Sequence, residues 1–236
     1  MFSTNNKSNI QDFLKLLALV AMMIDHYGMY MNNAEIYRVI GRFALPVFAF
    51  YTGYNFHGKM RHIIWILGAI LIGLHMYILD HFITNVLITL AFGQLYLTYA
   101  GKAILADEQT FLRHFVGMLI LMPLVIPFMD YGTVGIAWMM VGYKFHNGGR
   151  RDEGYLLLAT LCVIIFNEYS FEKMNYSLWS ALGAVAMASL SALFLKYANH
   201  EKPIPVDIRL ITRNMLYIYF VSIVGLLGVV YSRIYI

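Results

Sequence analysis

Long apolar runs separated by short polar segments divide the chain of 236 residues almost from end to end. A transmembrane helix needs about 20 mostly apolar residues, with a range of roughly 17 to 25. The pattern predicts nine helices, near residues 12–31, 36–56, 62–79, 83–100, 113–129, 132–146, 154–170, 176–197 and 210–232. The fifth, sixth and seventh runs are short and the joint at Asp80–Thr84 is tight, so eight spans is the alternative. The predicted fold is an all-α, polytopic transmembrane bundle that forms one integral-membrane domain, residues 1–236.

Composition supports a lipid environment. Hydrophobic residues make up 60% of the chain and charged residues only 13%, whereas soluble domains carry about 25% charged residues. The net charge of +4 is modest and gathers in the predicted loops, so it is a membrane-orientation signal and not a nucleic-acid footprint. The first apolar run is predicted to be retained and not cleaved as a signal peptide. No small-residue cleavage site follows this run, and Asp25 and His26 interrupt its far end.

The distribution of basic residues predicts a cytoplasmic N-terminus, because cytoplasmic loops carry an excess of Lys and Arg. With nine spans, thirteen of the 17 basic residues fall in inner segments and the C-terminus lies outside. The inner residues are Lys7, Lys15, Lys59, Arg61, Lys102, Arg113, Lys144, Arg150, Arg151, Lys196, Lys202, Arg209 and Arg213. Arg38, Lys173 and Arg233 fall outside, and Arg42 is intramembrane.

Three ionisable residues are predicted to lie inside the membrane at similar depth. Asp25 and His26 lie near the far end of the first helix, and Arg42 lies one to two turns into the second. Charge at the centre of a bilayer costs at least about 2.5–3.5 kcal/mol, so it needs a reason. We expect Asp25 to bridge to Arg42 and His26 to face an adjoining cavity. The alternative is that the ion pair fixes helix packing and that His26 is a hydrogen-bonded packing residue.

Other polar residues collect near the same side of the membrane. Asn85 opens the fourth predicted helix, and Tyr131 lies in the turn into the sixth. A zinc site from His75, Asp80 and His81 has suitable ligand types, but the spacing matches no strong metal signature, so no metal is predicted. Five further histidines are expected at the inner side, in contact with solvent or headgroups: His57, His62, His114, His146 and His200.

The strongest candidate for binding an anion is the inner loop that follows the sixth predicted helix. Gly148 and Gly149 allow close backbone approach, and Arg150 and Arg151 can clamp phosphates, with Lys144 one turn earlier. The alternative is an ordinary positively charged inner loop. The sequence contains no phosphate-binding Gly-rich loop, no Gly-x-Ser-x-Gly elbow and no His-Glu-x-x-His.

The first two predicted helices carry a pattern that resembles the TraX family, named for the membrane enzyme linked to N-terminal acetylation of conjugative pilin. The matching residues are Asp12-Phe13-Leu14-Lys15, Ile24-Asp25-His26, Gly41-Arg42-Phe43-Ala44-Leu45-Pro46-Val47-Phe48-Ala49-Phe50 and Gly53-Tyr54-Asn55, with weaker similarity at Asn85-Val86-Leu87 and Tyr131-Gly132. The C-terminal helix departs from the pattern. Family members often carry a histidine in an aromatic-rich segment there, and Tyr217–Ser222 has none.

The resemblance implies an integral-membrane acetyltransferase of the bacterial cytoplasmic (inner) membrane. Such an enzyme would move an acetyl group from cytoplasmic acetyl-CoA to an acceptor amine or hydroxyl at the outer face. The acceptor would be a pilin-like peptide or a glycan, since the first-helix motif is also similar to membrane acyltransferases that acetylate sugars. His26 would act as general base or form an acetyl-histidine intermediate. Asp25 would tune the site, and Arg42 would stabilise the oxyanion or hold Asp25.

Further roles and two other functions stay open at this point. Asn85 and Tyr131 would position the substrates, and the 144–151 segment would hold the nucleotide. A proton-coupled transporter would also use intramembrane Asp, His and Arg, although no paired broken helices of the transporter kind are visible. A non-catalytic assembly factor for a pilus or secretion apparatus would need these residues only for stability. The predicted partners are acetyl-CoA, the acceptor and membrane lipid, without nucleic acid, and a homo-oligomer is left open.

Overall fold

The computed structural model describes residues 7–32, 34–80, 82, 84–125, 131–148, 156, 159–161, 163 and 177–235. Its elements are α1 (Ile10–Tyr27), the π-helical turn η1 (Gly28–Asn32), α2 (Glu35–Gly41), α3 (Ala44–Tyr54), α4 (His62–Leu79), α5 (Val86–Ala106), α6 (Glu108–Val125), α7 (Val134–Asn147), α9 (Leu178–Tyr197), α10 (Arg209–Arg213) and α11 (Met215–Tyr235). Within these residues there is no strand, only an isolated bridge between Asn9 and Pro203. The predicted all-α class is confirmed for this part of the chain.

Four helical segments are long and apolar enough to cross a membrane. They are Ile10–Met31, which joins α1 to η1, and then His62–Leu79, Leu178–Tyr197 and Met215–Arg233. Large apolar side chains such as Ile66, Trp179 and Leu182 are exposed on them, and a surface of that kind indicates contact with lipid. The count of nine spans stays a prediction, and the predicted helix 154–170 lies mostly outside the described residues.

Segments predicted to share one side of the membrane meet in the structure. At the end that holds the start of α1, here called the proximal end, the Ser8 hydroxyl donates to Asp207 at 3.2 Å. At the opposite, distal end, the Ser177 hydroxyl donates to Glu35 at 2.6 Å. These two contacts agree with the predicted grouping of the segments at the two ends of the bundle, while the alternation of all nine predicted spans stays a prediction. The assignment of the proximal end to the cytoplasm stays a prediction.

The second predicted helix, 36–56, is wrong as a continuous element. It consists of α2 and α3, which are broken at Arg42 and Phe43. The cause is Pro46, which has no N–H to donate to the carbonyl of Arg42 four residues earlier and whose ring crowds that carbonyl. Both residues at the break are buried, so protein and not lipid surrounds the interrupted backbone.

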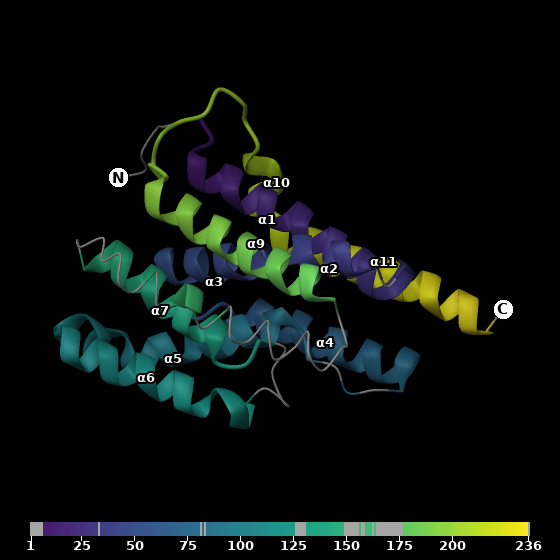
Figure 1. Cartoon of the computed structure of the whole chain (residues 1–236), viewed down its shortest axis with the longest axis horizontal. Coiled ribbons are helices and arrows are strands. Elements are labelled where there is room, and N and C mark those ends of the chain that lie inside the picture. The colour runs from purple at the N-terminus through teal and green to yellow at the C-terminus, as the bar shows by residue number, and fades with distance from the viewer. Residues whose placement is uncertain are drawn as a thin grey trace.

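Two short helices, α3 and α7, form the centre of the bundle. Eight of the 11 residues of α3 and ten of the 14 residues of α7 are buried. In Figure 1 this pair lies between α1 and α9 on one side and α5 and α6 on the other, in agreement with the contacts between elements. At 1.5 Å per residue, α7 is roughly 21 Å long, which is short of a hydrocarbon core of about 30 Å. The sixth predicted span is therefore an internal helix.

Glycines allow the backbones of α3 and α7 to touch. A Cβ added at Gly53 would lie 1.9 Å from the Met139 carbonyl oxygen, and one at Gly142 would lie 2.0 Å from the Phe50 carbonyl oxygen. The contact is reciprocal, because each helix places a glycine on a carbonyl of the other. Small residues play this role wherever membrane helices approach closely.

Substitution of Gly142 by Ala should lower the thermal stability of the protein in detergent. The added methyl group has no free space against a backbone carbonyl, so the helices must separate, and overpacking of this kind costs about 1–3 kcal/mol. Gly73→Ala is the matched control, since that helical glycine has nothing within 4 Å of an added Cβ and Ala favours a helix. Equal midpoints for the two variants would contradict the contact.

Candidate functional site

Asp25 forms a buried ion pair with Arg38. The Arg38 Nη1 atom donates to Asp25 Oδ2 at 2.8 Å, and both side chains are almost fully covered. The predicted partner was Arg42, which lies one turn later and belongs to the junction between α2 and α3. Arg38, which was expected among the outer cations, is the residue that pairs with Asp25 of α1.

Gly41 is what lets α2 approach the carboxylate so closely. A Cβ added there would lie 2.3 Å from the Asp25 Cβ atom. The Gly-Arg pair in the sequence is therefore explained by packing as well as by charge, because any side chain at position 41 would displace Asp25.

The geometry of His26 leaves one ring nitrogen available as a base. Its Nδ1 atom lies 2.7 Å from the Met22 carbonyl oxygen. Since a carbonyl only accepts, Nδ1 must donate, and in the neutral ring Nε2 then carries the lone pair. Tyr30 stacks on the ring with centroids 6.2 Å apart, and Tyr219 contacts it edge-on at 5.5 Å. Tyr219 belongs to the aromatic segment of α11 that lacks a histidine, so this segment still reaches the site.

His26 lines a small cavity of about 10 Å³. This volume is close to the minimum that holds one water molecule. Asp25, Leu45, Phe48 and Tyr131 contribute to the same wall. The structure thus brings together three of the predicted residues, Asp25, His26 and Tyr131.

The predicted positioning residue Asn85 does not line this cavity. Its Oδ1 atom accepts from the Leu87 N–H at 3.1 Å and its Nδ2 atom donates to the Gly68 carbonyl at 3.0 Å. It is therefore the N-cap of α5 and a tie between α4 and α5. Only its neighbour Val86 reaches the cavity wall.

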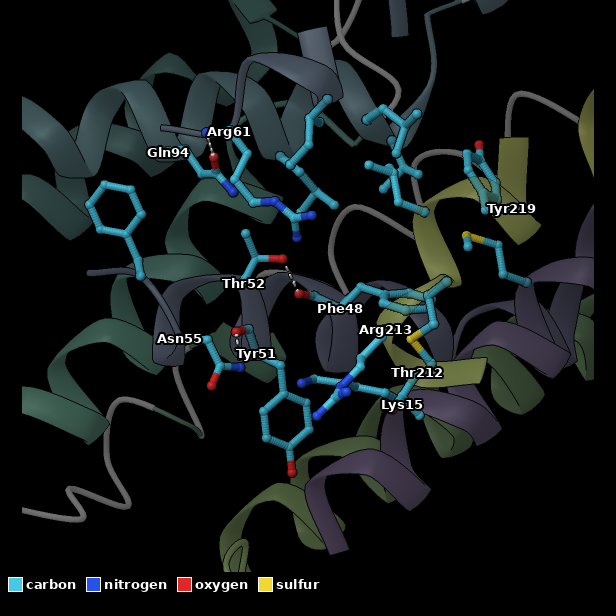
Figure 2. Close-up of a pocket in the computed structure, with 18 of the residues that line it drawn as sticks. Lys15, Phe48, Tyr51, Thr52, Asn55, Arg61, Gln94, Thr212, Arg213 and Tyr219 are labelled. Carbon is cyan, nitrogen blue, oxygen red and sulfur yellow. Dashed lines mark hydrogen bonds between the residues drawn. The ribbon is translucent and has the colours of Figure 1, made fainter. Parts of the chain in front are cut away.

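A larger cavity of about 260 Å³ adjoins the small one. Met22, Phe48 and Val86 line both. Toward the proximal end the larger cavity is lined by four basic residues, Lys15, Lys59, Arg61 and Arg213, together with Thr52, Asn55 and Gln94. Figure 2 shows the nitrogen-bearing ends of Lys15 and Arg213 beside the Tyr51 ring, whereas Arg61 ends on the other side of Thr52 and Phe48. These four cations lie far apart in the sequence, and no motif predicted that they would line one cavity.

One face of α1 connects the two cavities. Lys15, Met22 and His26 are spaced i, i+7 and i+11, which places them within about 40° of one another around the helix at 3.6 residues per turn. Lys15 lines the large cavity, His26 the small one and Met22 both. This spacing was visible in the sequence, and it was the signal that could have found the cation end of the site.

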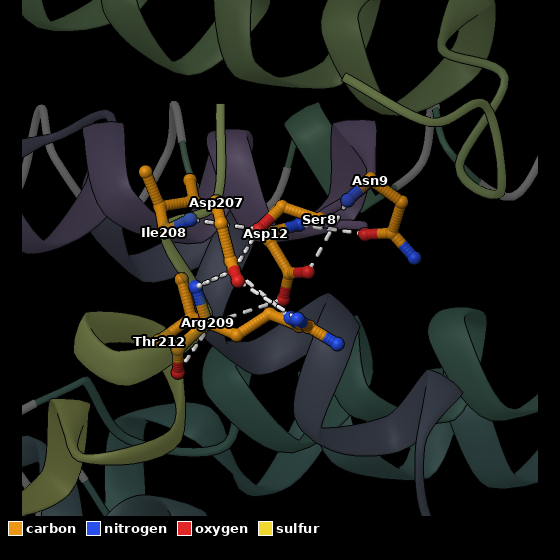
Figure 3. Close-up of polar contacts among 7 residues, drawn as sticks. All are labelled: Ser8, Asn9, Asp12, Asp207, Ile208, Arg209 and Thr212. Atoms are coloured by element: carbon orange, nitrogen blue, oxygen red, sulfur yellow. Dashed lines mark hydrogen bonds and ion pairs between the residues drawn. The ribbon is translucent and has the colours of Figure 1, made fainter. Parts of the chain in front are cut away.

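A polar network holds α10 so that Thr212 and Arg213 reach the large cavity. The Thr212 hydroxyl donates to Asp12 Oδ1 at 3.1 Å, and the Ile208 N–H donates to the Ser8 hydroxyl at 2.8 Å. Figure 3 shows Asp207 between Ser8 and Arg209. Hydrogen bonds from Arg209 hold the pKa of Asp207 well below its ordinary value.

The described part of the predicted phosphate-binding loop lies away from both cavities. Lys144 lies with its Nζ atom 4.4 Å from the centre of the Phe111 ring, and Gly148 caps α7 by donating its N–H to the Lys144 carbonyl at 2.7 Å. Neither residue lines the two cavities. Gly149, Arg150 and Arg151 lie outside the described residues.

One histidine differs from expectation. His200, expected at the surface, is buried, and its Nδ1 atom lies 2.8 Å from the Tyr51 hydroxyl. His75 donates from Nδ1 to the Leu71 carbonyl at 2.7 Å and accepts at Nε2 from the Tyr30 hydroxyl. Among the described residues no three His, Cys, Asp or Glu side chains are grouped to hold a metal ion, and His81 lies outside them.

The fold and the buried charges define a helical membrane protein with an ionisable site between its first helices. A family model described as TraX protein matches residues 10–230, and the chain belongs to the TraX family. It is similar to the uncharacterized protein RP591 of Rickettsia prowazekii (strain Madrid E), with 31% identity over 231 residues that cover 95% of this chain and 93% of the relative. No solved structure matches the chain significantly.

Replacement of Arg38 by Met should destabilise the protein by about 3–5 kcal/mol, because it leaves the Asp25 carboxylate buried without its partner. The double variant Asp25→Asn/Arg38→Met should regain part of the loss, since it removes both charges. Thermal unfolding in detergent measures both effects. As a control, Arg209→Met breaks an exposed pair and should change little. If the double variant lost as much stability as the sum of the Asp25→Asn and Arg38→Met losses, the result would argue against the ion pair.

Proposed function

We propose that this TraX family protein is an integral-membrane acetyltransferase of the bacterial cytoplasmic membrane. It would transfer the acetyl group of cytoplasmic acetyl-CoA to an acceptor amine or hydroxyl at the outer face, on a pilin-like peptide or a glycan. The observation that carries the proposal is the pair of adjoining cavities, one lined by four cations and the other by the available nitrogen of His26. The association of the family with pilin acetylation supports the reaction type.

In this proposal the large cavity receives the donor. Lys15, Lys59, Arg61 and Arg213 suit phosphate groups, and the apolar wall of Met22, Phe48 and Val86 suits an uncharged arm. Eleven residues along α1 separate Lys15 from His26, roughly 16 Å at 1.5 Å per residue. A donor with phosphates at one end and a thioester at the end of a long arm fits this separation. The volume is slightly below that of pockets which enclose a whole ligand, roughly 300–1,000 Å³, so the nucleotide would lie at the mouth.

The proposed reaction uses His26 Nε2 as general base. The acceptor nitrogen or oxygen attacks the thioester carbonyl, and the new C–N or C–O bond forms as the C–S bond breaks. The acceptor proton passes to His26 and then to the departing thiolate. The ion pair of Asp25 and Arg38 would hold the last turn of α1, which carries His26, against α2. Tyr131 would orient the acceptor, and Arg42, which lines neither cavity, would hold the α2–α3 junction.

A second candidate function is a proton-coupled transporter. The observation that favours it is the row of polar groups that continues from His26 to Tyr30 and His75 across α1, η1 and α4, since such rows serve as proton relays. Substrate-driven proton flux in liposomes without thioester turnover would select the transporter. A non-catalytic assembly factor would show neither activity.

The cation pair Lys15 and Arg213 should be needed for acetyl-CoA binding. A charged hydrogen bond contributes about 1.5–3 kcal/mol, so Lys15→Met/Arg213→Met should raise the Kd by at least about tenfold in equilibrium dialysis of the purified protein. Arg150→Ala/Arg151→Ala, in the loop favoured by the sequence, is the control and should bind normally. A larger rise in Kd for Arg150→Ala/Arg151→Ala than for Lys15→Met/Arg213→Met would instead indicate that the nucleotide binds at that loop.

His26→Ala should keep acetyl-CoA binding and lose thioester turnover by about 10²–10⁴-fold, the usual contribution of a general base. Release of free thiol from acetyl-CoA, with water as the slow acceptor, gives the rate, and thermal unfolding checks that the variant is folded. Turnover at the wild-type rate in a folded variant would remove His26 from the mechanism.

A further inference from the structure

The first turn of α3 forms part of the wall of the small cavity. Ala44 and Leu45 are both 3% exposed, and they line the same space as His26. Gly41 of α2 completes this wall from the other side of the helix break. A group that enters from the large cavity past Met22 and Phe48 therefore meets a space with room for about one water molecule, and Leu45 is part of its wall.

The wall has little freedom to move. A Cβ added at Gly135 of α7 would lie 3.7 Å from Leu45 Cδ1 and 2.6 Å from Thr89 of α5, so the space behind Leu45 is filled by α7 and α5. The glycine contacts between α3 and α7 prevent α3 from shifting as a body. Protein interiors are close-packed, so an added methylene group here has to displace several elements at once.

We propose that Leu45, supported by Ala44 and Phe48, limits the acyl group of the donor to two carbons. The inference rests on the proposed acyl transfer and assigns the residues that select the substrate by size. Each methylene beyond acetyl must overpack the end of the cavity, which typically lowers kcat/KM by about 10- to 200-fold. The bonds made and broken are those of the acetyl reaction, because a longer acyl chain changes only the group carried by the carbonyl.

The test compares thiol release from acetyl-CoA, propionyl-CoA and butyryl-CoA by the purified full-length protein. The wild type should prefer acetyl-CoA to propionyl-CoA by at least about tenfold, and to butyryl-CoA, with two added methylenes, by at least about 100-fold. Leu45→Ala opens the wall, and it should raise the butyryl-to-acetyl ratio of kcat/KM by about tenfold or more. Leu45→Val is the milder variant, with an intermediate ratio, if the first proves unstable.

Leu97→Ala is the matched control. Leu97 is as deeply buried as Leu45 but lies on α5 and lines neither cavity, so this variant loses stability without changing the ratio. Ala44→Val narrows the cavity and should slow acetyl release while acetyl-CoA binding, set by the distant cations, is retained.

The outcomes separate this inference from the proposed function. Similar wild-type rates on the three thioesters would overturn the size limit and leave the proposed acyltransferase function intact. An unchanged butyryl-to-acetyl ratio of kcat/KM in folded Leu45→Ala and Leu45→Val would do the same. An equal change of ratio in Leu97→Ala would attribute the effect to general loosening and would also overturn it. Absence of release from every ester would overturn the proposed function and the size limit with it.

Discussion

The site depends on an interrupted helix that protein must cover on all sides. A backbone break exposed to lipid would leave unsatisfied carbonyl and amide groups at a cost of several kcal/mol each. The break at Arg42 and Phe43 is buried, and α3, which follows it, contacts α1, α7 and α9. A helix of 11 residues cannot span a bilayer, so α3 has no lipid face to satisfy. Its whole surface is available to pack and to line cavities. Both cavities lie along it, since Phe48 belongs to each.

Close helix approach then fixes where the charges sit. Gly41 places α2 against Asp25, and the Gly53 and Gly142 contacts fix α3 to α7. Inside a membrane, association cannot rely on the hydrophobic effect, and contacts through small residues take its place. A buried ion pair such as that of Asp25 and Arg38 contributes little net stability by itself, but it strongly penalises any arrangement that separates the two charges. Packing and charge therefore select the same relative position of α1 and α2, and that position sets the orientation of His26.

The sequence predicted the parts of the site that depend on local order and missed those that depend on distant contacts. Asp25, His26 and Tyr131 were predicted to share one side of the membrane, and all three line the small cavity. The pairing of Arg38 with Asp25 was not predicted, because Arg38 and Arg42 are one turn apart and the sequence does not show which of them reaches α1. The partnership of Lys15 with Arg213 joins residues 198 positions apart, which periodicity does not reveal. His200 was misplaced for the same reason. It is buried where the 198–204 segment crosses the start of α1, and carbonyl groups of that segment accept hydrogen bonds from N–H groups of α1.

The arrangement along α1 has a consequence for how two substrates could meet. Lys15 and His26 lie on one face of a single rigid helix, so the distance between the cation end and the base is set by helical geometry and not by loop conformation. In the proposed function, a donor anchored at the proximal end would present its reactive group at a fixed depth, beside the small cavity that Leu45 lines. The acceptor would then approach from the distal side, where Tyr131 lies in the turn before α7. Separate approaches from opposite ends would allow one substrate to stay bound while the other exchanges. They would also account for a base toward the distal end and cations at the proximal one.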